Sequence, residues 1–102
     1  MDFDYKCCGL AETMKVVGSK WAIPILFTLM SGRQRFSNLQ KTLDISPRTL
    51  SLRLNQLEKN QLITKQVFAE VPPRVEYDLT ERGRSLNEII SKMCQWGEKS
   101  SA

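Results

Sequence analysis

The chain has 102 residues, of which 41% are hydrophobic and 25% charged, so it is long enough for one domain with a modest core and too short for two. Its net charge is +4, and the stretch from Arg33 to Lys59 holds six cations against two carboxylates, a local surplus that favours a polyanionic partner. The sequence contains no histidine, which excludes histidine-based triads and most transition-metal sites, so we expect no metal and no cofactor.

The N-terminal region indicates a cytoplasmic protein. Its first residues are acidic and no apolar stretch follows them, unlike a secretory signal peptide. The longest apolar run, Trp21 to Leu29, is too short to cross a membrane. Cys7, Cys8 and Cys94 are an odd number of cysteines and do not match a secreted disulfide framework, so we expect thiols in a reducing cytosol.

Two helices are predicted before residue 32. The first covers residues 10–17 and ends at Gly18, which is typical of a helix C-terminus. The second covers residues 20–30. Its predicted apolar face consists of Ile23, Leu26, Phe27 and Met30. Pro24 is compatible with a helix within its first turn, so this helix either begins near residues 21–23 or is kinked.

A helix-turn-helix is predicted over residues 36–60. A short helix over 36–42 and a turn over 43–45 precede Ser46-Pro47, an N-cap serine with proline at the first helical position. The longer helix that starts there has a core stripe at i, i+4 and i+7. This stripe consists of Leu50, Leu54 and Leu57.

Two strand-like runs over residues 62–79 predict a β-hairpin, which would make the module a winged helix-turn-helix. The runs cover 62–68 and 75–79, and the second alternates strictly between apolar and polar residues. Proline cannot donate a ladder hydrogen bond, so Pro72-Pro73 belongs in the turn between the strands. Arg74 follows it at the tip of the wing.

A last helix is predicted from Glu81, capped by Thr80, to about Trp96. This helix and the first one carry more apolar side chains than a small domain requires. They are Leu10, Met14, Val17, Ile89, Ile90, Met93 and Trp96. Either the core of one domain absorbs them or they form a dimer interface, and a twofold dimer suits a palindromic DNA site.

The predicted fold is therefore mainly α with a small β-hairpin, in a single winged helix-turn-helix domain over 1–102. The second helix of such a motif lies in the major groove of DNA and directs its N-terminal residues at base edges. The candidate contacts on this helix are Pro47, Arg48, Thr49, Ser51, Leu52 and Asn55.

The side-chain types assign roles to these candidates. Arg48 can grip guanine bidentately, Asn55 can pair with adenine, and Thr49 or Ser51 can reach a base or a phosphate. Leu52 lies opposite the leucine stripe and has no place in the core. It either contacts a thymine methyl group or is an ordinary exposed leucine.

Two further arginines are candidate contacts outside this helix. Arg35 is expected at a phosphate or in solvent. Arg74 on the wing is expected over the DNA backbone or in the minor groove. The alternative for Arg74 is a structural salt bridge to Glu70 or Glu76.

Cys7 and Cys8 stand just before the first helix. The helix N-terminus and the neighbouring Lys6 both favour a reactive thiolate there, which suits a sensor of oxidants or electrophiles. The alternative is an inert, partly buried thiol. An enzyme built on these thiols would lack a histidine base and a CxxC pair, so we expect no enzyme.

Together these features resemble the HxlR-type winged-helix regulators, relatives of the MarR repressors, from about Cys8 to Gly97. The residues that carry the resemblance are Gly18-Ser-Lys-Trp21, Arg35-Phe36-Ser-Asn-Leu39, Ile45-Ser46, Leu50, Leu54, Leu57-Glu58, Glu70-Val-Pro-Pro-Arg-Val-Glu-Tyr77, Leu79-Thr80-Glu81, Gly83, Leu86 and Trp96-Gly97. The sequence departs from the family pattern at Gly9, where proline is common, and at Ser19, where a second glycine is common.

The resemblance implies a homodimeric bacterial or archaeal transcription regulator, dimerised by helices over about 8–17 and 81–97. Several members sense quinones, aldehydes, hypochlorite or disulfide stress through one N-terminal cysteine, which falls on Cys8. We therefore expect a sequence-specific repressor that binds a pseudo-palindromic double-stranded DNA operator and is released when Cys8 is oxidised or alkylated. The alternatives are such a regulator without a thiol switch and a winged-helix module that binds protein.

Overall fold

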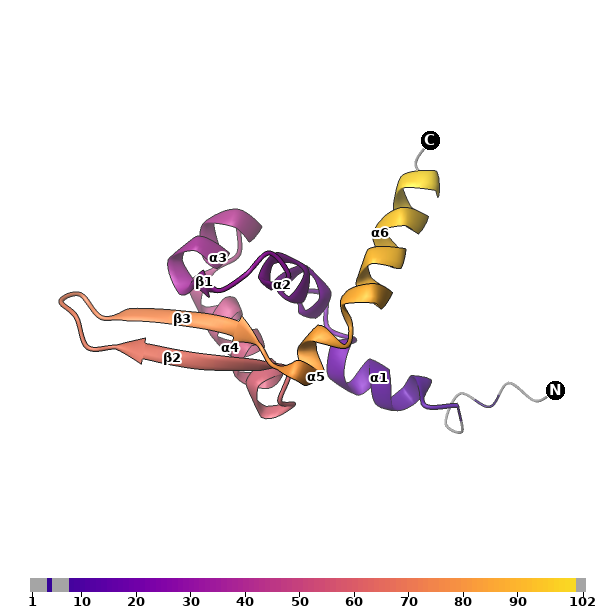
Figure 1. Ribbon diagram of the computed structural model, residues 1–102, viewed down its shortest axis with the longest axis horizontal. Coiled ribbons are helices and arrows are strands. Elements are labelled where there is room, and N and C mark those ends of the chain that lie inside the picture. The colour runs from indigo at the N-terminus through magenta and orange to yellow at the C-terminus, as the bar shows by residue number, and fades with distance from the viewer. Residues whose placement is uncertain (1–3, 5–7, 101–102) are drawn as a thin grey trace.

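A computed structural model of the chain describes Asp4 and residues 8–100 and shows a winged helix-turn-helix (Figure 1). Its elements in chain order are α1 (Leu10–Val17), α2 (Ala22–Leu29), β1 (Gln34–Arg35), α3 (Phe36–Leu43), α4 (Pro47–Lys59), β2 (Ile63–Phe68), β3 (Arg74–Leu79), α5 (Glu81–Arg84) and α6 (Asn87–Ser100). The predicted fold class is confirmed: α3 and α4 form the helix-turn-helix, and β2 and β3 form the wing.

Helix α2 begins late enough to accommodate its proline. Trp21 occupies the N-cap position, so Pro24 lies in the first turn, where no intrahelical hydrogen bond is lost. The buried stripe follows the spacing i, i+3, i+4 and i+7. It consists of Ala22, Ile25, Leu26 and Leu29. The predicted apolar face was therefore wrong at Phe27, which lies on the other side of the helix and is 50% exposed.

The helix-turn-helix forms from local signals that the sequence displays. Asp44 ends α3 in the left-handed conformation with φ of 51°. The side chain of Ser46 then accepts a hydrogen bond from the backbone N–H of Thr49 at 3.2 Å, and Pro47 is the first residue of α4. The stripe predicted for α4 is confirmed, because Leu50, Leu54 and Leu57 are all buried. The core therefore lies on one side of α4.

The sheet has three antiparallel strands in the order β1-β3-β2, and β1 was not predicted from the sequence. This two-residue strand pairs Gln34 with Tyr77 and Arg35 with Glu76. Two residues are too few to show an alternating pattern, so β1 can be recognised only from its pairing with β3. The alternation of β3 is confirmed at Tyr77 and Leu79, which face the core.

The single helix predicted after Thr80 is instead two helices, α5 and α6. The Thr80 side chain accepts a hydrogen bond from the backbone N–H of Gly83 at 3.0 Å, and it donates one to the carbonyl of Gln61. The chain turns at Ser85 and Leu86, and the Leu86 N–H bonds to the carbonyl of Gly83 three residues back. As a result α6 projects away from the sheet and the helix-turn-helix, as Figure 1 shows.

Candidate DNA-binding surface

The outward face of α4 carries the candidate base contacts. Because the leucine stripe is buried, the opposite face is left to solvent. The candidate contacts that are exposed on α4 are Pro47 at its start and Arg48, Ser51, Leu52 and Asn55 beyond it. Leu52 is 51% exposed, so it packs against little of the chain's own core. An apolar side chain in the middle of an otherwise polar face is available to the C5-methyl group of thymine.

Thr49 differs from these neighbours because its hydroxyl takes part in the start of the helix. It is partly buried and accepts a hydrogen bond from the Ser46 hydroxyl at 2.9 Å, while its N–H donates to the same Ser46 oxygen. Of the expected contacts on α4, Thr49 thus has its polar groups engaged in the N-cap.

A concavity of about 440 Å³ lies between the wing and the start of α3. Its lining comprises Arg35, Phe36, Ser37 and the wing residues 70–75. Arg35 is exposed at the N-cap position of α3, at the edge of this concavity. A contact between Arg35 and a DNA phosphate remains a prediction.

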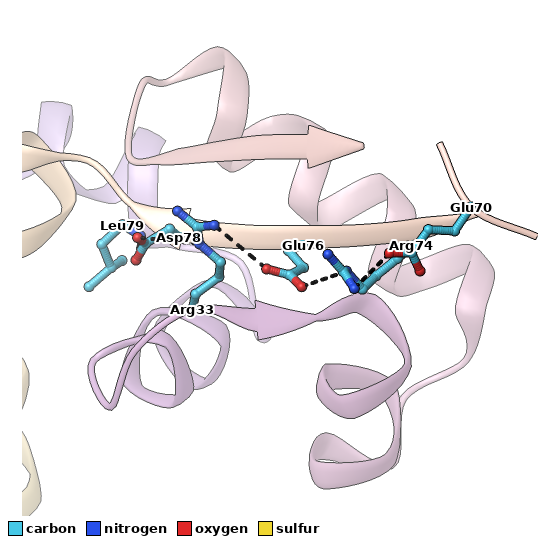
Figure 2. Close-up of polar contacts among 6 residues, drawn as sticks. All are labelled: Arg33, Glu70, Arg74, Glu76, Asp78 and Leu79. Atoms are coloured by element: carbon cyan, nitrogen blue, oxygen red, sulfur yellow. Dashed lines mark hydrogen bonds and ion pairs between the residues drawn. The ribbon is translucent and has the colours of Figure 1, made fainter. Parts of the chain in front are cut away.

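Arg74 forms the salt bridges to Glu70 and Glu76 that are the alternative to DNA binding. Its guanidinium lies 2.8 Å from a carboxylate oxygen of Glu70 and 2.9 Å from one of Glu76. It also stacks over the ring of Phe68, 4.0 Å from the ring centroid. Figure 2 shows Arg74 between the two carboxylates. A direct DNA contact by Arg74 remains a prediction.

Arg33 belongs to the basic stretch noted in the sequence, and its structural role was not predicted. Its guanidinium lies 3.7 Å from Glu76 and 4.0 Å from Asp78, so it extends the row of charges along β3 (Figure 2). These partners follow from the position of β1 beside β3. No local pattern near Arg33 indicates them.

The two cysteines within the described residues are both exposed. Cys8 precedes α1 and Cys94 lies on α6, while Cys7 is outside the described residues.

In Asp4 and residues 8–100, no group of three or more Cys, Asp and Glu side chains is placed to hold a metal ion. Likewise, no helix of this part of the chain is long and apolar enough to cross a membrane.

Helices α1 and α6 expose most of the apolar side chains assigned to a dimer interface. The exposed ones are Leu10, Met14, Ile89, Met93 and Trp96. Val17 is partly buried against the core. Ile90 needs correction: it is 1% exposed and belongs to the core of this chain, because the turn before α6 directs it at the other buried side chains.

A helix-turn-helix with an exposed polar face on its second helix, followed by a two-stranded wing, defines the class of winged helix-turn-helix DNA-binding proteins. The model of the HxlR-like helix-turn-helix family matches residues 16–102. The chain belongs to this family and is a DNA-binding transcriptional regulator of the HxlR and MarR type.

Relatives and solved structures agree with this assignment. YdeP, an uncharacterised HTH-type transcriptional regulator of Bacillus subtilis, is 40% identical over 97 residues, which cover 94% of this chain and 76% of YdeP. The oxidised form of the redox regulator HypR is similar with a TM-score of 0.83 and 36% identity, over 90% of this chain and 96% of HypR. The reduced form of the transcriptional regulator YodB of B. subtilis is similar with a TM-score of 0.77 and 33% identity, over 91% of this chain and 92% of YodB.

Proposed function

We propose that this chain acts as a homodimeric repressor that reads a pseudo-palindromic operator with α4 and leaves it when Cys8 is oxidised or alkylated. The observation that carries the DNA-reading part is the exposed face of α4, opposite the buried leucine stripe. On this face Arg48 and Asn55 contact purines, Ser51 contacts a base or a phosphate, and Leu52 contacts a thymine methyl group.

The dimer follows from the exposed apolar surface of α1 and α6. Met93 and Trp96 on α6 and Leu10 and Met14 on α1 would each lose contact with water against a second copy. A twofold axis between the copies places two α4 helices at half-sites about one DNA turn apart. A change in the position of α1 at this interface would alter their spacing.

The position of Cys8 supports the thiol switch. It is exposed and lies two residues before α1, so a group attached to its sulfur would act on a helix of the proposed interface. HypR, which is 36% identical, is a redox regulator. This similarity supports a redox role for Cys8. Because Cys8 lies next to α1, its modification could change the dimer interface and thereby the spacing of the two α4 helices.

The switch has two chemical forms. An azo oxidant such as diamide accepts two electrons and two protons from two thiols, becomes the hydrazine, and leaves a disulfide between Cys8 and either the partner's Cys8 or the partner's Cys94. A quinone instead forms a carbon–sulfur bond with the Cys8 thiolate, and a proton reaches the quinone oxygen. Either product adds a covalent constraint or bulk before α1.

A gel shift on the DNA upstream of this protein's own gene tests the proposal. Reduced protein should bind specifically, diamide should remove binding, and added thiol should restore it. Cys8→Ser should bind the same DNA and ignore diamide, with Cys94→Ser as the matched control that separates the two disulfides on a non-reducing gel. Binding that is indifferent to diamide in the wild type would favour an HxlR-type regulator with no thiol switch.

A further inference from the structure

Arg74, the cation next to the wing loop, is held by its own chain. Arg74 touches Glu70, Glu76 and the ring of Phe68 at once, and 25% of its side chain is exposed. These three groups approach the guanidinium from both strands and from the loop between them. These contacts restrict the guanidinium to one orientation and leave little of its surface accessible to a DNA phosphate.

Glu76 is the centre of this arrangement. It is 16% exposed, and its two carboxylate oxygens face different arginines, Arg74 at 2.9 Å and Arg33 at 3.7 Å. The register of the sheet places Glu76 opposite Arg35 of β1 on one side and Gln66 of β2 on the other. Glu76 thus lies on the middle strand, where it can tie the wing to the segment that leads into α3.

The charges of this cluster do not make the wing an electrostatic anchor for DNA. Glu70, Arg74 and Glu76 together carry one positive and two negative charges. Arg33 adds a cation, and its other partner Asp78 adds a third carboxylate. A direct phosphate contact requires a cation whose charge is available to the phosphate, whereas here the carboxylates already neutralise it.

The same contacts fix the place of the wing loop. Glu70 begins the stretch that lines the concavity facing Arg35 and Ser37, and its carboxylate is held by Arg74. Because β1 runs directly into α3, the ion pair between Arg33 and Glu76 also links the wing to the helix-turn-helix. The spacing between the wing and α3 therefore depends on Glu76 and Arg74 together.

We propose that Arg74 is a positioning residue, which together with Glu76 holds the wing at a fixed distance from α3, and that it does not contact DNA directly. This inference rests on the DNA-binding function of the chain. It assigns the wing's DNA contacts to the surface that Arg74 holds in place, including the fully exposed Val71 at the tip. It also makes a carboxylate necessary for binding a polyanion.

The decisive experiment is Glu76→Gln, measured as affinity for the specific operator duplex at a fixed salt concentration. If electrostatics alone decided the outcome, removal of a negative charge near DNA would raise the affinity for DNA. Loss of the positioning contact should instead lower it, by about five- to tenfold. Asp44→Asn is the matched control, because it removes one carboxylate from the helix-turn-helix outside this cluster and should leave affinity equal or higher. Unchanged or higher affinity for Glu76→Gln would overturn the proposal.

Substitutions of Arg74 separate positioning from direct contact. Arg74→Lys keeps the charge but loses the planar fork that joins two carboxylates, so it should bind about as weakly as Arg74→Ala. A direct phosphate contact would let lysine retain most of the affinity. The double variant Arg74→Ala with Glu76→Gln should bind DNA no more weakly than Arg74→Ala alone, because both substitutions break the same ion-pair cluster. Additive effects of opposite sign would contradict the inference.

Two further measurements keep the result interpretable. The thermal midpoint of each variant shows whether the domain remains folded, which we expect because the core residues of β3 lie on its other face. Arg48→Ala on the same duplex tests the base-reading role of α4 independently. If Arg48→Ala loses specificity while Glu76→Gln has no effect, the proposed function stands and the positioning role is refuted.

Discussion

Gly83 packs directly against the backbone carbonyl of Leu62. A Cβ atom at position 83 would lie 2.1 Å from that oxygen, and the Leu62 oxygen also accepts a hydrogen bond from the N–H of Thr80 at 3.0 Å. The end of α4, the start of β2 and the turn into α5 therefore meet at a point that has no room for a side chain. Since α6 follows α5, this contact helps to set the direction of the proposed dimer helix.

Gly83→Ala should destabilise the fold by about 2–3 kcal/mol, because backbone atoms must move to admit the methyl group. The matched control is Gly97→Ala on α6, where a Cβ would meet nothing within 4 Å. This second change should be neutral or stabilising by up to about 1 kcal/mol, since alanine favours a helix over glycine. Urea unfolding of both variants measures the difference, and equal midpoints would contradict the close contact at Gly83.

The elements predicted correctly from the sequence are those that carry local signals. The N-cap and proline at Ser46-Pro47 mark the start of α4, and the leucine spacing identifies its buried face. Strand β1 and the turn at Ser85 have no comparable signal. They arise when β3 pairs with a distant segment and when Gly83 meets Leu62, and both are contacts between residues far apart in the chain.

Leu52 and Leu54 test the two faces of α4 against each other. Leu54 is fully buried, so Leu54→Ala should cost about 2–5 kcal/mol of stability. Leu52 is half exposed, and Leu52→Ala should change stability by less than about 0.5 kcal/mol.

The proposed DNA contact of Leu52 can be measured by replacing each operator thymine with uracil, which removes the C5-methyl group. One such replacement should weaken binding by the wild type and leave binding by Leu52→Ala unchanged. If every uracil-containing duplex binds as tightly as the parent to the wild type, Leu52 is an ordinary exposed leucine.

The candidate site was predictable to the extent that it depends on one helix. Helical spacing alone places Arg48, Leu52 and Asn55 on the face opposite the core, and the structure exposes all three. For Arg74 the sequence indicates a cation near the wing tip with two possible carboxylate partners. The strand register brings Phe68 opposite Arg74 and Glu76 beside Arg35, and this register could not be derived from local composition.

Tyr77 should make the stability of the domain sensitive to alkaline pH. Burial, followed by the nearby Glu58 carboxylate, raises the pKa of Tyr77 above its ordinary value of 10.0. Between pH 10.0 and the higher folded-state pKa, the unfolded chain loses the phenolic proton while the folded chain retains it. The unfolded state therefore binds fewer protons, and stability falls as pH rises.

Tyr77→Phe removes this titration while keeping the ring. The free energy of unfolding of the wild type should decline above pH 10.0 more steeply than that of Tyr77→Phe, with no such divergence at lower pH. Chemical unfolding at several alkaline pH values measures both curves. Parallel curves would show that the phenol ionises equally in the folded and unfolded chain.

Arg48 is the side chain on which the sequence specificity of α4 should depend most. It is exposed in the first turn of α4, where a recognition helix approaches base edges. If it grips a guanine bidentately, Arg48→Ala should weaken specific binding by about 1–3 kcal/mol and relax the preference at one base pair. Arg48→Lys keeps the charge and loses the bidentate geometry, so it should recover non-specific affinity more than specificity.

The measurement is the ratio of specific to non-specific affinity across a range of salt concentrations. Arg82→Ala on α5 is the control, because it removes one positive charge from an exposed site on a different helix. A phosphate-only role for Arg48 would reduce specific and non-specific binding alike and lower the salt slope by about 0.9. An unchanged ratio would therefore assign Arg48 to the DNA backbone and leave base reading to Leu52 and Asn55.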